Sequence, residues 1–215
     1  MALSEYRKQE TFCPLWAAAG VSISLLGMTA GFWELIDILT PFIFPLILMG
    51  VLVIFWATLA WSLVHVLRKK RYKKTFAFFP LGMQLLALLI IMTVPFSSIM
   101  LDLDFKRHLK EREKVVSRVI SGELKPNVAH NTSLILLPDD QKYLSKGGGE
   151  IMVEKHSGET SVFFFMFRGV LDNFSGFMYR SDDSNPQRDD FDGDFFEIKR
   201  INENWYWAAS GDGSD

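Results

Sequence analysis

The amino-acid sequence predicts a membrane protein with three transmembrane α-helices and a small extracytoplasmic α+β domain that contains an antiparallel β-meander. Three observations predict this fold class. The first hundred residues contain three long apolar stretches, which are typical of membrane-spanning helices. Six of the seven residues that follow the second stretch, at positions 68–74, are basic. From residue 131 onwards, short apolar runs alternate with turn residues, a pattern that is typical of β-strands.

The charges are distributed unevenly along the 215 residues. Residues 1–100 carry eight Lys/Arg and four Asp/Glu, whereas residues 101–215 carry fifteen Lys/Arg and twenty-one Asp/Glu. An acidic carboxyl-terminal domain is a poor candidate for nucleic-acid binding, because the phosphate backbone would repel it. The single cysteine, Cys13, excludes a disulfide within the chain and a Cys/His zinc motif.

The first predicted span covers about residues 14–33, after a cytoplasmic amino terminus of residues 1–13. Its twenty residues carry no charge and match the thickness of the hydrocarbon core. Small residues within it recur at spacings of four, three and four, so they lie on one helix face: Gly20, Ser24, Gly27 and Gly31. Such a face allows close approach of another helix, either from a second copy of the chain or from its own second or third span.

The second predicted span covers about residues 42–67 and the third about residues 76–100, which completes a transmembrane region of residues 14–100. A basic loop at residues 68–75 connects these two spans. Its basic residues are Arg68, Lys69, Lys70, Arg71, Lys73 and Lys74. Gln84 is the one strongly polar side chain inside the third stretch, and we expect it to form a hydrogen bond with a neighbouring helix.

The basic loop predicts the orientation of the chain, because loops rich in Lys and Arg stay in the cytoplasm. The amino terminus is then cytoplasmic and the carboxyl-terminal domain lies outside, in a multi-pass protein of the inner or plasma membrane. The connector after the first span contains Glu34 and Asp37 and no basic residue, which agrees with this orientation. Basic residues at positions 106–114 favour the opposite orientation, but acidic residues are interleaved with them.

Residues 101–122 are predicted to form a helical stalk that ends at Gly122, and residues 123–215 to form the sheet domain. In the stalk, apolar residues recur at near-helical spacing. The later apolar runs and turns predict a meander of about five strands with one face covered by the preceding helix. Residues 162–167 are continuously apolar, so this strand is expected to be covered on both faces.

The acidic loop at residues 182–194 is the sharpest candidate for chemistry. Asp190, Asp192 and Asp194 occupy alternate positions and could place oxygen atoms around a hard cation such as Ca²⁺. The loop does not match the helix-loop-helix calcium pattern, and aspartate is common in turns. A solvated loop without a cation therefore remains the alternative.

Aromatic residues are dense near the carboxyl end of the sequence and include Trp205, Tyr206 and Trp207. Exposed on the surface, they would bind a carbohydrate or a partner protein. Buried, they would form the core of the sheet. Alternation along a strand places Trp205 and Trp207 on one face and Tyr206 on the other.

The sequence contains no Gly-x-Ser-x-Gly, His-Glu-x-x-His or phosphate-loop motif. We therefore expect no catalytic residue and no cofactor other than Ca²⁺ at the acidic loop. The predicted function is that of a non-catalytic binding module, such as an accessory subunit, a sensor or a protective factor. Its expected partners are the lipid bilayer and a protein, which is either a different protein or a second copy. The alternative is a cell-envelope hydrolase or transferase that uses a divalent cation at residues 182–194.

Overall fold

The computed structural model describes residues 2–69, 78–129, 131–156, 158–169 and 173–211, and of residues 2–14, 68 and 69 it describes the backbone alone. The chain forms two compact units, Met1–Leu101 and Asp102–Asp215. The basic loop predicted at residues 68–75 falls outside the described side chains.

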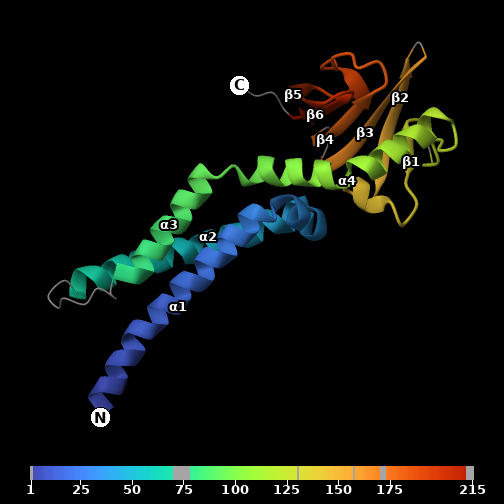
Figure 1. Ribbon diagram of the computed structural model, residues 1–215. Coiled ribbons are helices and arrows are strands. Elements are labelled where there is room, and N and C mark those ends of the chain that lie inside the picture. Colours follow the sequence, from blue (N-terminus) through green and yellow to red (C-terminus); the bar gives the residue numbers. More distant parts are fainter. Residues whose placement is uncertain (1, 70–77, 130, 157, 170–172, 212–215) are drawn as a thin grey trace. The chain divides into compact units, whose positions relative to one another are not determined.

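The first unit is helical. It contains α1 (Ala2–Ala30), α2 (Phe32–Lys69), α3 (Phe79–Thr93) and the first residues of α4 (Phe96–Ile120). α1 packs against both α2 and α3 (Figure 1). The contact contains a buried apolar cluster of Val21, Leu25 and Phe55.

The helix that contains the first predicted span is longer than that span. α1 begins at Ala2, before the predicted start of the membrane-spanning part near residue 14. At its other end, helical hydrogen bonding continues across Gly31, whose amide donates to the Gly27 carbonyl oxygen at 2.8 Å. The carbonyl oxygen of Gly31 accepts from the amide of Leu35 at 2.9 Å. A glycine can occupy a helix interior at a cost of only about 1 kcal/mol, so it does not by itself end a helix.

The real interruption lies within α2, at Thr40. Its backbone has φ 68° and ψ 156°, outside the helical region. Pro41 follows, and a residue before proline is disfavoured in the helical conformation. Glu34 and Asp37, which we expected in a connector, therefore belong to the helical segment before this break.

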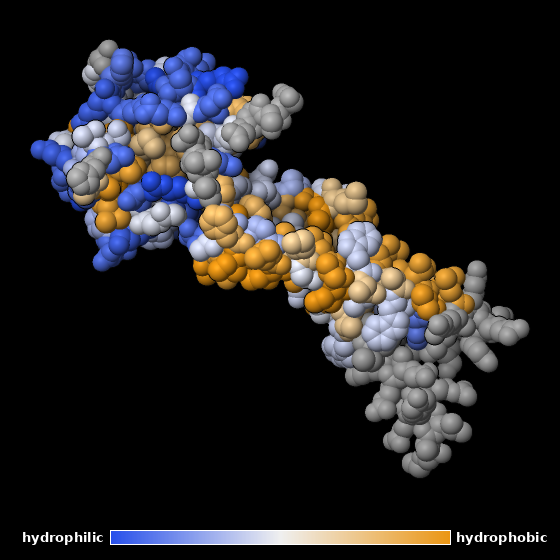
Figure 2. Space-filling view, turned by 180° about the vertical axis from the view of Figure 1, so that it is seen from behind, coloured by the Kyte–Doolittle hydropathy of each residue, from blue (hydrophilic) through white to orange (hydrophobic). Residues whose placement is uncertain are grey.

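Among the described helices, one segment is long and apolar enough to cross a membrane, namely Phe32–Leu67 of α2. Only 11% of its most apolar window is buried, unlike the core helix of a soluble protein. The apolar part of α1, Leu15–Ala30, is shorter, and α3 and α4 meet the criterion only when counted together across a break. This break contains Pro95, a residue type that removes a helical backbone hydrogen bond. Figure 2 shows apolar side chains over much of the helical unit, whereas hydrophilic residues predominate on the sheet unit.

Gln84 of α3 forms the predicted hydrogen bonds with a neighbouring helix. Its side chain is fully buried. Its amide nitrogen donates to Oγ1 of Thr58 at 2.8 Å, and its carbonyl oxygen accepts from Oγ of Ser62 at 2.9 Å. Both partners lie on α2, so this polar pairing fixes how α2 and α3 align.

The second unit is a six-stranded antiparallel sheet with the order β1-β2-β3-β4-β6-β5. Its strands are β1 (Leu134–Leu136), β2 (Glu150–His156), β3 (Glu159–Arg168), β4 (Phe174–Arg180), β5 (Phe195–Asn202) and β6 (Trp205–Ser210). The predicted meander of five strands is therefore only partly correct. β6 lies between β4 and β5, because the long loop after β4 carries the chain past the position that β6 later fills. A tight turn with Asn204 at φ 62° then brings β6 back beside β5.

The two faces of the sheet are covered differently. α4 lies along one face (Figure 1), where the Phe105 ring contacts those of Phe177 and Trp205 at centroid distances of 5.1 and 5.5 Å. The loop at residues 181–194 covers the other face and buries Phe191 against Phe163, at a centroid distance of 5.6 Å. The prediction that the central strand is covered on both faces is confirmed.

The predicted end of the stalk helix is also confirmed. α4 ends at Ile120, and Gly122 has φ 77°, the left-handed conformation that glycine adopts without strain. The amide of Gly122 donates back to the Val119 carbonyl oxygen at 3.1 Å, as is typical of a glycine-terminated helix.

Candidate functional site

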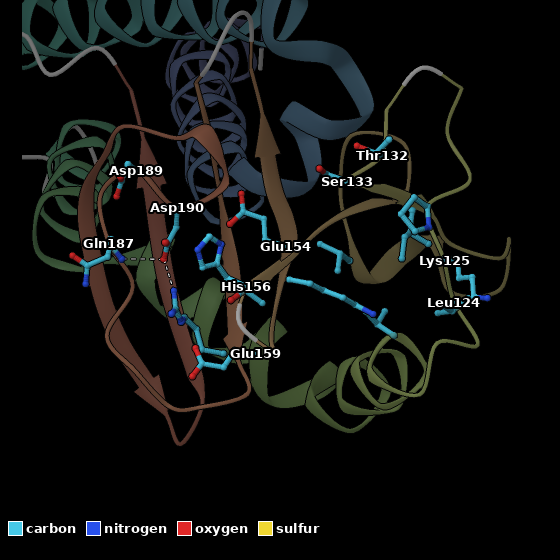
Figure 3. Close-up of a pocket in the computed structure, with 17 residues that line it drawn as sticks. Leu124, Lys125, Thr132, Ser133, Glu154, His156, Glu159, Gln187, Asp189 and Asp190 are labelled. Carbon is cyan, nitrogen blue, oxygen red and sulfur yellow. Dashed lines mark hydrogen bonds and ion pairs between the residues drawn. The ribbon is translucent and has the colours of Figure 1, made fainter.

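A groove of about 790 Å³ lies beside the carboxyl-terminal half of β2 (Figure 3). One side, continuous with the face that α4 covers, is apolar and basic and is formed by Val119, Leu124, Lys125, Val153 and Lys155. The other side is polar and largely acidic and is formed by Glu154, His156, Arg180, Gln187, Asp189 and Asp190. In Figure 3 the acidic residues and the Leu124–Lys125 segment lie on opposite sides of the strand.

The groove exists because β1 is shorter than β2. The register pairs Leu134 of β1 with Met152 of β2, and the last backbone bond runs from the Val153 amide to the Ser133 carbonyl oxygen at 2.8 Å. β2 continues to His156 and pairs there with β3 alone among the described strands. Its outer edge is therefore open beyond Val153.

Asn131 determines where the pairing stops. Its side-chain oxygen accepts hydrogen bonds from the amides of Ser133 and Leu134, at 2.8 and 3.0 Å. The Ser133 amide, which would otherwise be directed to β2, is thereby occupied. The chain turns away before it can pair with Lys155.

The acidic side of the groove is organised by one arginine. Nη1 of Arg180 lies 2.6 Å from Oδ2 of Asp190, and the backbone amide of Gln187 donates to the same oxygen at 2.9 Å. Partial burial raises the pKa of Glu154. A hydrogen bond from the backbone amide of Phe191 lowers this pKa, and the negative charge of Asp190 raises it. A cation placed beside Glu154 would relieve this unfavourable environment.

The aspartates predicted to bind a cation do not converge. Asp190 pairs with Arg180, and Asp194 pairs with Arg188 at 3.1 Å. Asp190–Asp192 forms a short 3-10 turn rather than an extended segment, so alternate carboxylates do not share one side. Among the described residues, no group of three His, Cys, Asp or Glu side chains could hold a metal ion. The geometry gives the Ca²⁺ hypothesis no support.

The aromatic residues near the carboxyl end belong to the core. Trp205, Tyr206 and Trp207 are only 2%, 1% and 9% exposed. The predicted alternation is confirmed, because Trp205 contacts Phe105 of α4 and Tyr206 lies in the cluster on the opposite face. Their proposed role as an exposed partner-binding surface is therefore wrong.

The small-residue face of α1 does not pack within the described part of the chain. Gly20, Ser24 and Gly27 are exposed, and a Cβ atom added to either glycine would meet nothing within 4 Å. Gly31 contacts only its own helical segment. Packing of this face against the second or third helix is not observed, and packing against a second copy stays a prediction.

Acid is expected to destabilise the loop that forms the acidic side of the groove. The backbone amide of Asn204 donates to the Asp183 carboxylate at 2.7 Å and lowers the pKa of Asp183 below its ordinary value of 3.8. Burial opposes this shift of the pKa, and Arg200 reinforces it. A carboxyl group with a lowered folded-state pKa stabilises the fold above about pH 4 and loses this contribution as the pH falls. We expect Asp183→Asn to reduce the fall in melting temperature between about pH 7 and pH 3. Asp140→Asn, at an exposed position, is the control, and equal pH profiles for Asp183→Asn and the parent would contradict the prediction.

Comparison with models of protein families, with curated proteins and with solved structures found no match. What defines the chain is therefore its own architecture: a helical unit with one segment fit to cross a membrane, and an antiparallel sheet unit with a groove at an open strand edge.

Proposed function

We propose that the chain is a multi-pass membrane protein whose sheet unit lies outside the cytoplasm and binds another protein without catalysing a reaction. The observation that carries the proposal is the apolar surface of the helical unit. Ile38 and Phe42, for example, are 72% and 68% exposed. Contiguous apolar surface of this kind is costly in water, at about 25 cal/mol per Å², and is stable in lipid.

Three passages through the bilayer fit the helices. Residues 41–69 of α2 would extend roughly 40 Å, more than the hydrocarbon core of about 30 Å. α1 supplies the first passage and continues across Gly31 into the first residues of α2. α3 together with the first residues of α4 supplies the third passage. The buried pairing of Gln84 with Thr58 and Ser62 supports this arrangement, because polar side chains in lipid need partners from neighbouring helices.

The orientation follows from the charge of the second connector. Residues 68–74 contain six basic residues, and such loops are retained in the cytoplasm. Two passages then place the amino terminus on the same side as this loop, and the third passage carries the sheet unit across.

The binding role follows from the groove. An open strand edge presents unpaired amide and carbonyl groups, which favour pairing with another chain. On β2 this edge lies between an apolar and basic side and an acidic side. The arrangement offers both backbone hydrogen bonds and selective side-chain contacts to a partner.

Cysteine labelling tests the orientation directly. Cys13→Ser removes the one cysteine of the chain, and Lys199→Cys then introduces a reporter at an exposed position on β5. We expect a membrane-impermeant maleimide to label this variant in intact cells. The matched reporter, Lys73→Cys in the basic loop, should react only after permeabilisation, and the reverse pattern would overturn the proposed orientation.

A further inference from the structure

We infer that the groove binds an extended peptide segment of a different protein, which adds to the sheet as a strand beside the open edge of β2; this inference rests on the proposed binding function. Strand addition provides affinity through backbone hydrogen bonds and selectivity through alternate side chains. Both requirements are met at residues 154–156, beyond the last backbone bond with Ser133.

The backbone groups at the edge have a defined direction. The Val153 amide points toward β1, because it donates to Ser133. Successive residues of a strand direct their amide and carbonyl groups to opposite edges. The amide and carbonyl of Lys155 therefore point to the same edge as those of Val153, into the groove. An added strand would continue the ladder from the point where Asn131 ends it.

The side chains of the groove specify a charge pattern for the ligand. Val153 already pairs with Ser133, so the ligand lies opposite the residues that follow Val153. A ligand residue opposite Glu154 would lie on the side of the groove that Asp189 and Asp190 also line, so it should be basic. A ligand residue opposite Lys155 should be acidic. In an antiparallel peptide, the acidic residue then immediately precedes the basic residue.

A second copy of the chain does not fit this edge. In a two-fold antiparallel pairing that centres on Lys155, the two Lys155 side chains lie opposite each other. The register that pairs Val153 with Lys155 is blocked, because Val153 already pairs with Ser133, and it would also place the two Glu154 side chains opposite each other. Like charges directly opposite each other destabilise a strand pair, so the occupant is a different protein.

The test uses the full-length chain in lipid nanodiscs and two fluorescent nine-residue peptides of identical composition. One has the central pair Glu-Lys and the other Lys-Glu. The Glu-Lys peptide should bind about tenfold more tightly, because two cross-strand charge pairs change sign between the peptides. Its binding should also slow hydrogen exchange at the Lys155 amide, a readout that does not depend on any variant.

Charge reversal locates the site. Glu154→Lys should abolish or reverse the preference between the two peptides. The matched control Glu197→Lys makes the same change at an exposed position of β5, the opposite edge of the sheet, and should leave the preference unchanged. Any one of four results would overturn the inference. These are equal binding of both peptides, no binding at millimolar concentration, unchanged hydrogen exchange at the Lys155 amide, and an equal effect of the control variant on the preference. Peptide failure together with the expected cysteine labelling refutes strand addition alone, whereas peptide binding with reversed labelling refutes the proposed orientation alone.

Discussion

Replacing Arg112 with Ala is expected to destabilise the sheet unit by about 3–5 kcal/mol, the usual consequence of removing one partner of a buried ion pair. The Arg112 side chain is fully buried between α4 and the sheet. Nη2 lies 2.6 Å from Oδ2 of Asp104, and Nε donates to the Leu144 carbonyl oxygen at 3.3 Å. The guanidinium also lies 4.6 Å from the ring centroid of Phe177.

The loss has two causes. Asp104 would lose its ion-pair partner in a mostly buried site, and the missing side chain would leave a cavity beneath α4. Arg188→Ala is the matched control, because Arg188 forms its ion pair with Asp194 on the surface, where such pairs contribute about 1 kcal/mol or less. Chemical unfolding of both variants in the same detergent measures the difference. Equal losses of unfolding free energy would contradict the structural role of Arg112.

Replacing Gly176 with Ala is expected to prevent the sheet from forming. A Cβ atom at this position of β4 would overlap the Phe164 carbonyl oxygen and would lie 2.8 Å from Cε1 of Phe163. The first contact is with backbone of the paired strand β3, so a side-chain rotation cannot relieve it. We expect a loss larger than the roughly 1–3 kcal/mol of ordinary overpacking, seen as absent or aggregated protein.

Gly211→Ala provides the control for this substitution. Its added Cβ would approach only the end of the exposed Phe196 ring, at 3.3 Å, which can move. Circular dichroism melts of the purified variants distinguish the two positions. A melting temperature for Gly176→Ala equal to that of the parent would show that β3 and β4 tolerate separation.

Local sequence patterns predicted the elements of the sheet unit well. Trp205 and Tyr206 lie on opposite faces of the sheet as expected, and Gly122 ends the stalk helix as expected. These features depend on short-range causes, namely side-chain alternation and the conformational freedom of glycine. The continuously apolar segment at residues 162–167 similarly predicted coverage on both faces.

The features that the sequence did not predict depend on contacts between distant segments. The position of β6 between β4 and β5 results from non-local pairing, which periodicity does not report. The groove depends on the difference in length between β1 and β2, which the lengths of the apolar runs in the sequence do not report. Spacing of Asp190, Asp192 and Asp194 suggested a cation site, but the direction of each carboxylate depends on backbone turns and on arginine partners elsewhere in the loop.

The central position of β6 has a consequence for biosynthesis. Of the six strands, the ribosome makes this one last, yet it supplies hydrogen bonds to two neighbours. Until Trp205–Ser210 has emerged, one edge of nascent β4 has unpaired backbone groups, which chaperones must shield. A premature stop codon before Trp205 would therefore yield an aggregation-prone product rather than a smaller functional protein.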